Sequence, residues 1–205
     1  MKKNQVLLLF ILLLNIACSK PKDQTEERQT LQFLEINQVQ INDPFWDPKF
    51  ELWSKTTIND VFDKFNGKYE PGSEYIYYSV KQRIGREQDG FLNFDLVAQG
   101  KRGIGQHDGP PWYDGLIYET IRAAADFISQ YPDPKLEQRI DGYIDRITAA
   151  QASEPDGYIN TYTQLIEPDH RWGFNGGRLS YQHDVYNAGM LIEAAVHYYK
   201  ATGKV

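Results

Sequence analysis

The chain has 205 residues, of which 41% are hydrophobic and 24% are charged, and its formal charge is −6 at pH 7. These values are typical of a soluble globular protein. The acidic balance, without a cluster of Lys or Arg in the body of the chain, argues against a nucleic-acid partner. Cys18 is the single cysteine, which excludes an internal disulfide and a cysteine-rich zinc site built from these residues alone.

Residues 1–17 predict an export signal. Two lysines precede nine apolar residues, Val6 to Leu14, and the small Ala17 directly precedes Cys18. Nine apolar residues are too few to cross a bilayer, which takes about 20. The segment resembles a bacterial lipoprotein signal, in which the cysteine is lipidated and becomes the mature N-terminus. We therefore expect an exported protein, anchored to a membrane through Cys18, in the periplasm or at the cell surface.

Residues 18–33 are polar and carry mixed charges, which indicates a flexible tether. The folded part is expected to cover residues 34–205. Its first segment, Leu34 to Ile41, alternates between apolar and polar residues and ends at Asp43-Pro44, which predicts one short β-strand. No second strand is visible to pair with it.

The rest of the chain predicts helices. Apolar residues recur at helical spacing in four segments, and Asp133-Pro134 is typical of a helix start. The four predicted helices cover residues 54–65, 113–131, 134–151 and 185–200. Only about three residues separate the second from the third, so these two form an antiparallel hairpin.

Two connections, residues 67–112 and 152–182, are long, with 46 and 31 residues. Structureless loops beyond roughly 15 residues are uncommon unless they are functional. If successive helices alternate in direction, both connections emerge at the same end of the array. The last helix carries apolar residues on more than one face, so we expect it to be buried on two sides. A stack of hairpins needs a polar outer face to close it, so we also expect the chain to be truncated after Val205.

The long connections and their borders hold the candidate site residues. Asp108 and Asp114 are compatible with the carboxylate pair of a glycosidase, which needs two acids about 5 to 10 Å apart. The alternative is structural: Asp108 caps a Gly-Pro turn, and Asp114 lies in the first turn of a helix, where the dipole favours it. A metal site at His107-Asp108 or His183-Asp184 is disfavoured because adjacent side chains seldom converge on one ion.

Aromatic residues are frequent at the same borders, namely Trp112, Tyr113, Tyr158 and Trp172. Flat aromatic faces beside hydrogen-bonding groups suit sugars. We expect two of these four side chains to belong to the core instead. His183, with Gln182 before it, either hydrogen-bonds a ligand hydroxyl or satisfies a backbone group. No phosphate loop, dinucleotide fingerprint or nucleophile elbow is present.

Three segments of the sequence carry a family resemblance. They run from Val39 to Trp46 (VQINDPFW), from Asp156 to Tyr162 (DGYINTY) and from Gln182 to Val196 (QHDVYNAGMLIEAAV). Together they resemble the catalytic domain of glycoside hydrolase family 127, the β-L-arabinofuranosidases. The resemblance implies an (α/α)6 barrel followed by β-sandwich domains, secretion, and hydrolysis of non-reducing-end L-arabinofuranosides or related plant-wall sugars. We therefore expect an all-α fold, an incomplete (α/α)6 barrel of helical hairpins with one short N-terminal β-strand.

The resemblance also implies roles for residues. In the family, the histidine that heads the His-x-x-Tyr segment hydrogen-bonds the sugar, and here this histidine is His183. The family's retaining mechanism uses a zinc-held cysteine nucleophile and a glutamate acid/base, both contributed by a later part of the chain. We therefore expect this chain to hold part of the sugar pocket, to carry neither metal nor cofactor itself, and to be inactive alone. The candidate substrate-binding residues are His183, Asp108, Asp114, Tyr158, Trp172 and Gln182.

Two other interpretations stay open at this point. The chain is also compatible with a surface lipoprotein that captures glycans without cleaving them. A further alternative is another helical-toroid sugar enzyme, such as an unsaturated uronyl hydrolase, which would use an aspartate on this face directly.

Overall fold

The computed structural model describes residues 31–68 and 88–204. The predicted export signal, Cys18 and all but the last three residues of the predicted tether lie outside this range and stay predictions. Contacts divide the chain after Leu34, and the fold described below is that of the unit beginning at Glu35. None of the helices in the described ranges is long and apolar enough to span a membrane.

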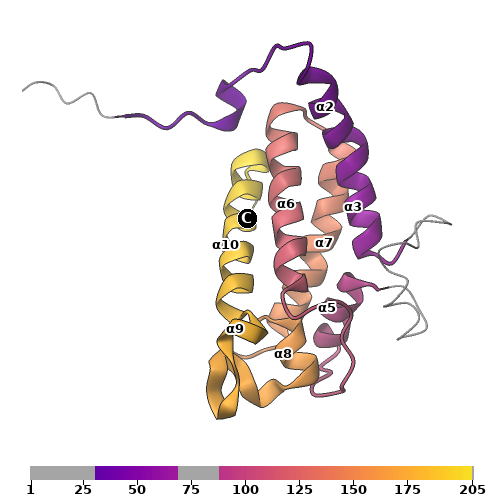
Figure 1. Cartoon of the computed structure of the whole chain (residues 1–205), viewed down its shortest axis with the longest axis vertical. Helices are drawn as coiled ribbons and strands as arrows, with labels where there is room; N and C mark the ends of the chain where they lie inside the picture. The colour runs from indigo at the N-terminus through magenta and orange to yellow at the C-terminus, as the bar shows by residue number, and fades with distance from the viewer. Residues whose placement is uncertain (1–30, 69–87, 205) are drawn as a thin grey trace, which may run out of the picture. The chain divides into compact units, whose positions relative to one another are not determined.

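The described residues are almost entirely helical (Figure 1). Among the described residues, β-type pairing is limited to one isolated antiparallel bridge, between Asn66 and Asp89. In chain order the helices are η1 (Ile36–Gln38), α2 (Asp47–Leu52), η2 (Trp53–Thr57), α3 (Ile58–Phe65), α5 (Gly90–Ala98), α6 (Tyr113–Gln130), α7 (Pro134–Ala152), α8 (Thr161–Ile166), η3 (Pro168–Gly176), α9 (Leu179–Gln182) and α10 (Asp184–Thr202).

The predicted N-terminal strand is wrong. Within residues 34–41 the chain forms the short 3-10 turn η1, which is closed by reciprocal hydrogen bonds between Glu35 and Gln38. The Gln130 side chain donates to the carbonyl oxygens of Ile36 and Val39, at 2.9 and 3.0 Å. These bonds satisfy backbone groups that a partner strand would otherwise have to pair.

The first helix exists but begins earlier than residue 54. Asp43 Oδ1 accepts hydrogen bonds from the backbone N–H groups of Phe45 and Trp46, at 2.8 and 2.9 Å, and so closes the turn that leads into the helix. From Asp47 the helix continues to Phe65 through the wider π-helical turn η2. The Asp43-Pro44 pair, predicted to end a strand, therefore starts a helix.

The predicted hairpin of α6 and α7 is confirmed. The Asp133 side chain caps α7 by accepting from the backbone N–H groups of Lys135 and Leu136, at 3.0 and 3.1 Å. Pro134 occupies the first turn, where its missing N–H costs nothing. Three residues connect the two helices, so they run antiparallel.

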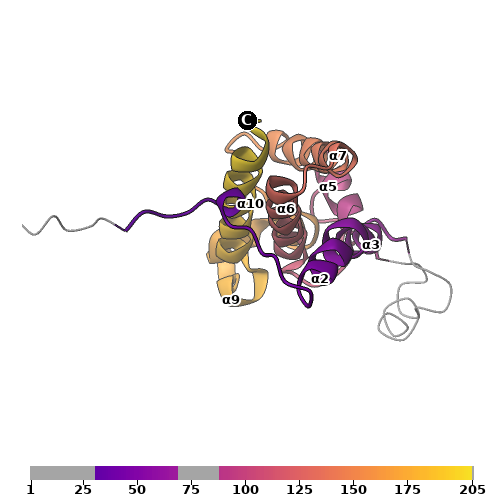
Figure 2. The ribbon, with the colours of Figure 1, turned by 90° about the horizontal axis from the view of Figure 1, so that it is seen from above.

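Helix α6 lies at the centre of the array, between α10, α7 and α3 (Figure 2). Its buried side chains, with those of α3, α5 and α7, form one core. The fully buried members include Phe62, Phe91, Phe94, Ile117, Tyr118 and Ile140. The unit is therefore all-α, an arrangement of helical hairpins consistent with part of an (α/α)6 barrel.

Helix α10 packs on α6, but it is buried on one side and not on two. Ala194 and Tyr198 face the core, whereas Ile192 and Val185 are 66% and 65% exposed. No described residue covers this second apolar face. Beside it, α6, α7 and α10 enclose an apolar groove of about 540 Å³.

The two long connections contain short helices that the periodicity did not predict, α5 in the first and α8 and α9 in the second. These helices are too short for the pattern to separate them from loops. They lie together at one end of the long helices, as Figure 1 shows, so the predicted clustering of both connections at one end is confirmed.

Candidate functional site

The connection after α5 is fixed to α8 by backbone hydrogen bonds. The N–H groups of Gly103 and Gly105 donate to the carbonyl oxygens of Gln164 and Leu165, at 2.9 and 3.1 Å. Both glycines have positive φ, 56° and 69°, a region that residues with a Cβ rarely adopt. Residues far apart in the sequence thereby meet at this end of the helices.

A buried polar cluster lies beneath this connection. The Asn93 side chain exchanges hydrogen bonds with the backbone of Asp108, at 2.9 and 2.8 Å, and the Asp108 carboxylate accepts from the Asp89 N–H at 2.9 Å. Asp114 accepts from the hydroxyl and the N–H of Thr161, at 2.6 and 2.7 Å. Both carboxylates are almost completely buried and bind protein donors. Asp108 thus holds the backbone of Asp89, and Asp114 holds that of Thr161, while their part in sugar binding stays a prediction.

Burial sets the protonation of this cluster. It lowers the pKa of His107 to about 4, against weaker raising effects of the Gly109 carbonyl and the Asp108 charge. It raises the pKa of Asp114 to about 6, against the hydrogen bonds from Thr161. His107 Nε2 lies 3.0 Å from the Thr161 hydroxyl, so a neutral histidine and a buried acid share one threonine. Near pH 7 the histidine is neutral and the acid is ionised.

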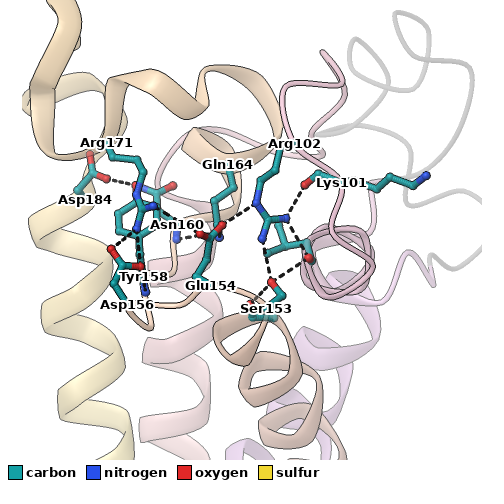
Figure 3. Close-up of polar contacts among 12 residues, drawn as sticks. Lys101, Arg102, Ser153, Glu154, Asp156, Tyr158, Asn160, Gln164, Arg171 and Asp184 are labelled. Carbon is teal, nitrogen blue, oxygen red and sulfur yellow. Dashed lines mark hydrogen bonds and ion pairs between the residues drawn. The ribbon is translucent and has the colours of Figure 1, made fainter.

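A second polar network, shown in Figure 3, holds the connection after α7. The Arg171 guanidinium lies 3.8 Å from the ring centroid of Tyr158 and binds both oxygens of Asp156, at 2.9 and 2.8 Å. The Tyr158 hydroxyl in turn donates to Asp184, the first residue of α10. Burial, together with the hydrogen bond to Asp184, raises the pKa of Tyr158. Tyr158 therefore links this connection to the start of α10.

Glu154 joins the two connections in the same view (Figure 3). Its Oε1 accepts from Arg102 Nε at 2.6 Å and from Gln164 Nε2 at 3.1 Å, and its Oε2 lies 3.4 Å from Arg171. Arg102 also donates to the Ser153 hydroxyl at 2.9 Å. A single carboxylate thus pairs with a cation from each connection.

Gln182 is fully buried at the end of α9. Its side-chain Nε2 donates to the backbone carbonyl oxygen of His170 at 2.9 Å. Its backbone carbonyl oxygen accepts from Asn160 Nδ2 at 2.9 Å. A Cβ at Gly177 would come within 2.7 Å of Gln182 Oε1, so this position has no space for a side chain. Gln182 therefore fixes the backbone that presents the next residue, His183.

Aromatic side chains and a histidine lie close together around the start of α10. We define this aromatic surface by Trp112, Tyr162, Tyr181, His183 and Tyr186. The rings of Trp112 and Tyr186 lie 5.0 and 6.0 Å from the His183 ring, and Tyr162 and Tyr181 lie 5.9 Å apart. Trp112 and Tyr181 are 39% and 46% exposed, so their ring faces are accessible.

His183 occupies a strained position between α9 and α10. Its φ of 59° lies in the left-handed region, which costs energy for a residue with a Cβ. Its Nδ1 lies 2.6 Å from the Tyr181 carbonyl oxygen, which can only accept, so Nδ1 carries a proton. In the neutral ring Nε2 is then an acceptor, directed away from this bond.

The structure does not bring all predicted site residues to one surface. Asp108, Asp114, Tyr158 and Gln182 are buried, whereas Trp172 is 42% exposed and packs edge-on against Tyr158 at 5.3 Å. His183 alone belongs to the aromatic surface. Among the four aromatic residues noted in the sequence, Tyr113 and Tyr158 are buried and Trp112 and Trp172 are exposed, which confirms the expectation that two belong to the core.

Several members of the site were not predicted from the sequence. Tyr162 and Tyr181 lie in segments assigned to a loop, and Asn93 lies in the unpredicted helix α5. Thr161 carries no local pattern that indicates a partner 47 residues away. Tyr186 was quoted for the family resemblance, and its position three residues after His183 at a helix start is the signal that places it beside His183.

The zinc centre that the resemblance implies does not fit the residues at hand. Within residues 31–68 and 88–204, no group of three His, Cys, Asp or Glu side chains is placed to hold a metal ion. The sequence holds one cysteine. No chemical step is therefore assigned to zinc at these residues.

Comparisons with known proteins identify the family. Residues 38–205 match the model of the β-L-arabinofuranosidase GH127 catalytic domain. A non-reducing end β-L-arabinofuranosidase from Bifidobacterium longum subsp. longum is 32% identical over 169 residues, covering 80% of this chain and 24% of the relative. The chain therefore belongs to the glycoside hydrolase family 127 catalytic domains, and it spans 24% of the length of this curated relative.

Solved structures agree with the fold. The GH127 β-L-arabinofuranosidase Ara127N-Se from Geobacillus stearothermophilus T6 superimposes with a TM-score of 0.63 at 31% identity, over 81% of this chain and 23% of that chain. The GH127 β-arabinofuranosidase BT3674 gives 0.61 at 26% identity, over 83% and 24%. The resemblance noted in the sequence is thus confirmed for both family and fold.

Proposed function

We propose that this chain supplies part of the sugar pocket of a retaining β-L-arabinofuranosidase that acts on arabinose-type sugars of plant cell walls. The observation that carries the proposal is the placement of His183 beside the exposed Trp112, with ring centroids 5.0 Å apart. An indole face stacks on the apolar face of a sugar ring, and His183 Nε2 accepts from a sugar hydroxyl.

Hydrogen bonds made by buried side chains give this pocket its rigidity. Gln182 and the Tyr158–Asp184 pair hold the two helices that flank His183, so its unfavourable backbone conformation is retained without a ligand. Tyr186 is fixed as well, because its hydroxyl donates to Glu119 at 2.8 Å. A pre-organised site loses less entropy when it binds its ligand.

The proposal is tested by calorimetric titration of the chain with methyl β-L-arabinofuranoside. His183→Ala and Trp112→Ala are each expected to weaken binding by about tenfold, the equivalent of one good hydrogen bond or stacking contact. His197→Ala is the matched control, since His197 lies on the same helix and pairs with Asp126 at 2.6 Å, away from the aromatic surface. If all three variants bind the sugar with equal affinity, the aromatic surface is not the sugar site.

We also propose that these 205 residues bind sugar without hydrolysing it, because their single cysteine, Cys18, directly follows the predicted export signal, where we expect it to be lipidated, and the described residues form no metal cluster. A chromogenic β-L-arabinofuranoside is expected to stay intact with the purified chain. Turnover that persists in a repurified sample contradicts this. The same assay on the protein purified from its source organism separates a hydrolase from a glycan-binding lipoprotein.

Export and lipid anchoring through Cys18 are part of the proposal. Growth with an alkyne-tagged fatty acid is expected to label the protein, and Cys18→Ala is expected to abolish the label. Labelling that survives this substitution would show that the lipid is not attached to Cys18.

A further inference from the structure

A second cavity lies at the opposite end of α6 from the aromatic surface. We call it the α2 groove. Residues 40–42, one face of α2 and η2, and Tyr131 line it, and its volume is about 430 Å³. Helix α6 has 18 residues and therefore spans about 27 Å, which separates Trp112 at its start from Tyr131 at its end.

The walls of the α2 groove combine polar and apolar surface in similar measure. They include the side-chain amides of Gln40 and Asn42, the carboxylates of Asp47 and Glu51, and the ammonium group of Lys55. Lys55 and Glu51 form an ion pair at 2.7 Å. The Gln40 and Asn42 side chains make no hydrogen bond to another described residue. The groove thus offers donors and acceptors in close succession, with a net formal charge of only one negative unit from Asp47.

Asp47 presents an unpaired carboxylate to the groove. The carboxylate makes no hydrogen bond or ion pair with the described residues, and its Oδ1 atom is buried. Asp47 lies in the first turn of α2, where the helix dipole favours its charge but supplies no side-chain hydrogen bond. A carboxylate without a donor is costly to desolvate, and a ligand hydroxyl in the groove can donate to it, because Asp47 lines the groove.

Tyr131 supplies an aromatic wall. Its side chain is 45% exposed in the turn between α6 and α7, and no hydrogen bond holds it. On its other side lies a smaller cavity of about 150 Å³, which shares Ser54 and Lys55 with the α2 groove. An exposed ring between two cavities presents a flat surface to a ring-shaped ligand.

We propose that the α2 groove binds a neutral saccharide of one or two sugar units, at a subsite separate from the aromatic surface. Its volume lies in the range of small-molecule pockets, about 300 to 1,000 Å³. Amides, one available carboxylate and an aromatic wall match the hydroxyl groups and apolar faces of a sugar. The ion-paired Lys55 makes the groove unsuited to an anion, since Glu51 already neutralises it. This inference does not depend on hydrolysis or on the proposed role of His183.

The test is nitrogen-15 NMR titration of the whole chain with L-arabinose and with arabinobiose. Amide signals of residues 40–42 and of Tyr131 are expected to shift together along one saturable curve. Tyr131→Ala and Asp47→Asn are expected to weaken this binding by about tenfold or more. Asn42→Ala, which removes no hydrogen bond to another described residue, is expected to weaken it without affecting folding. Tyr199→Ala is the control for loss of an exposed tyrosine at another surface.

His183→Ala separates the two sites. It is expected to leave the titration curve at the α2 groove unchanged while it moves the curve at the aromatic surface to about tenfold higher sugar concentration. If the shifts at residues 40–42 are absent, persist in Asn42→Ala and Asp47→Asn, or are reproduced by an alkylammonium ion in place of the sugars, the proposal is overturned. If the groove responds and the aromatic surface does not, the second site stands and the proposed function fails.

Discussion

Thr161→Val tests whether the buried polar cluster holds the loop end of the array together. The substitution keeps the side-chain shape but removes the hydroxyl that donates to Asp114 Oδ1 at 2.6 Å. At about pH 7.5 the Asp114 carboxylate is ionised, and a hydrogen bond to a charged group contributes about 1.5 to 3 kcal/mol. We therefore expect the free energy of unfolding to fall by about 2 to 3 kcal/mol at this pH. His107 also loses one neighbour but keeps Asn93, at 3.2 Å.

The expected effect depends on pH. Burial holds the pKa of Asp114 at about 6 in the folded chain, above the value of about 4 in the unfolded chain. Its ionisation therefore costs stability as the pH rises through this window. Without the Thr161 hydroxyl the folded pKa rises further. Below about pH 5 the acid is protonated in both proteins, so the difference in stability should shrink to about 1 kcal/mol, the value for a neutral hydrogen bond.

Urea unfolding followed by far-UV circular dichroism measures both values. Thr163→Val is the matched control, because Thr163 lies in the same helix, is fully buried, and makes no hydrogen bond to a charged group. It is expected to change stability by less than about 1 kcal/mol at either pH. If Thr161→Val has the same effect at both pH values, or matches the control, the assigned role of Asp114 is wrong.

Three further outcomes are expected. Tyr158→Phe should destabilise the chain by about 2 to 4 kcal/mol near pH 7, because it removes the one hydrogen-bond donor that the described residues give the buried Asp184 side chain. Asp184→Asn in the same background should recover part of the loss in urea unfolding. The His107 ring should not titrate in NMR spectra between about pH 5 and 8, since burial lowers its pKa to about 4, and a midpoint near 6.5 would contradict its burial. Ile192→Lys should reduce concentration-dependent association in analytical ultracentrifugation, because Ile192 is 66% exposed on the open apolar face of α10, whereas unchanged association would exclude that face.

The long helices could be predicted because their signals are local. Asp133-Pro134 and Gly203 mark helix ends in the sequence, and the structure uses them as a cap and as a left-handed C-terminal residue with a φ of 73°. The apolar stripe of α6 likewise becomes the centre of the core. These features depend on residues within one or two turns of each other.

The remainder depends on contacts between distant residues. The predicted strand failed because Gln130 pairs with the backbone of Ile36, a contact that no local pattern contains. The role of Asp114 could not be fixed either, since a helix-start acid and a catalytic acid have the same sequence signature. Its hydrogen-bonding partner Thr161 comes from another connection, so no local pattern contains this contact.

The most direct test of the account is the response of the Trp112 indole N–H and the His183 ring to methyl β-L-arabinofuranoside in NMR spectra of the labelled chain. Both signals are expected to shift along one saturable curve, and the His183 shift is expected to report a hydrogen bond at Nε2. His183→Ala is expected to move the Trp112 curve to about tenfold higher sugar concentration. Sugar-induced shifts that bypass Trp112 and His183, or none at all up to saturating sugar, would contradict the assignment of the sugar pocket to the aromatic surface.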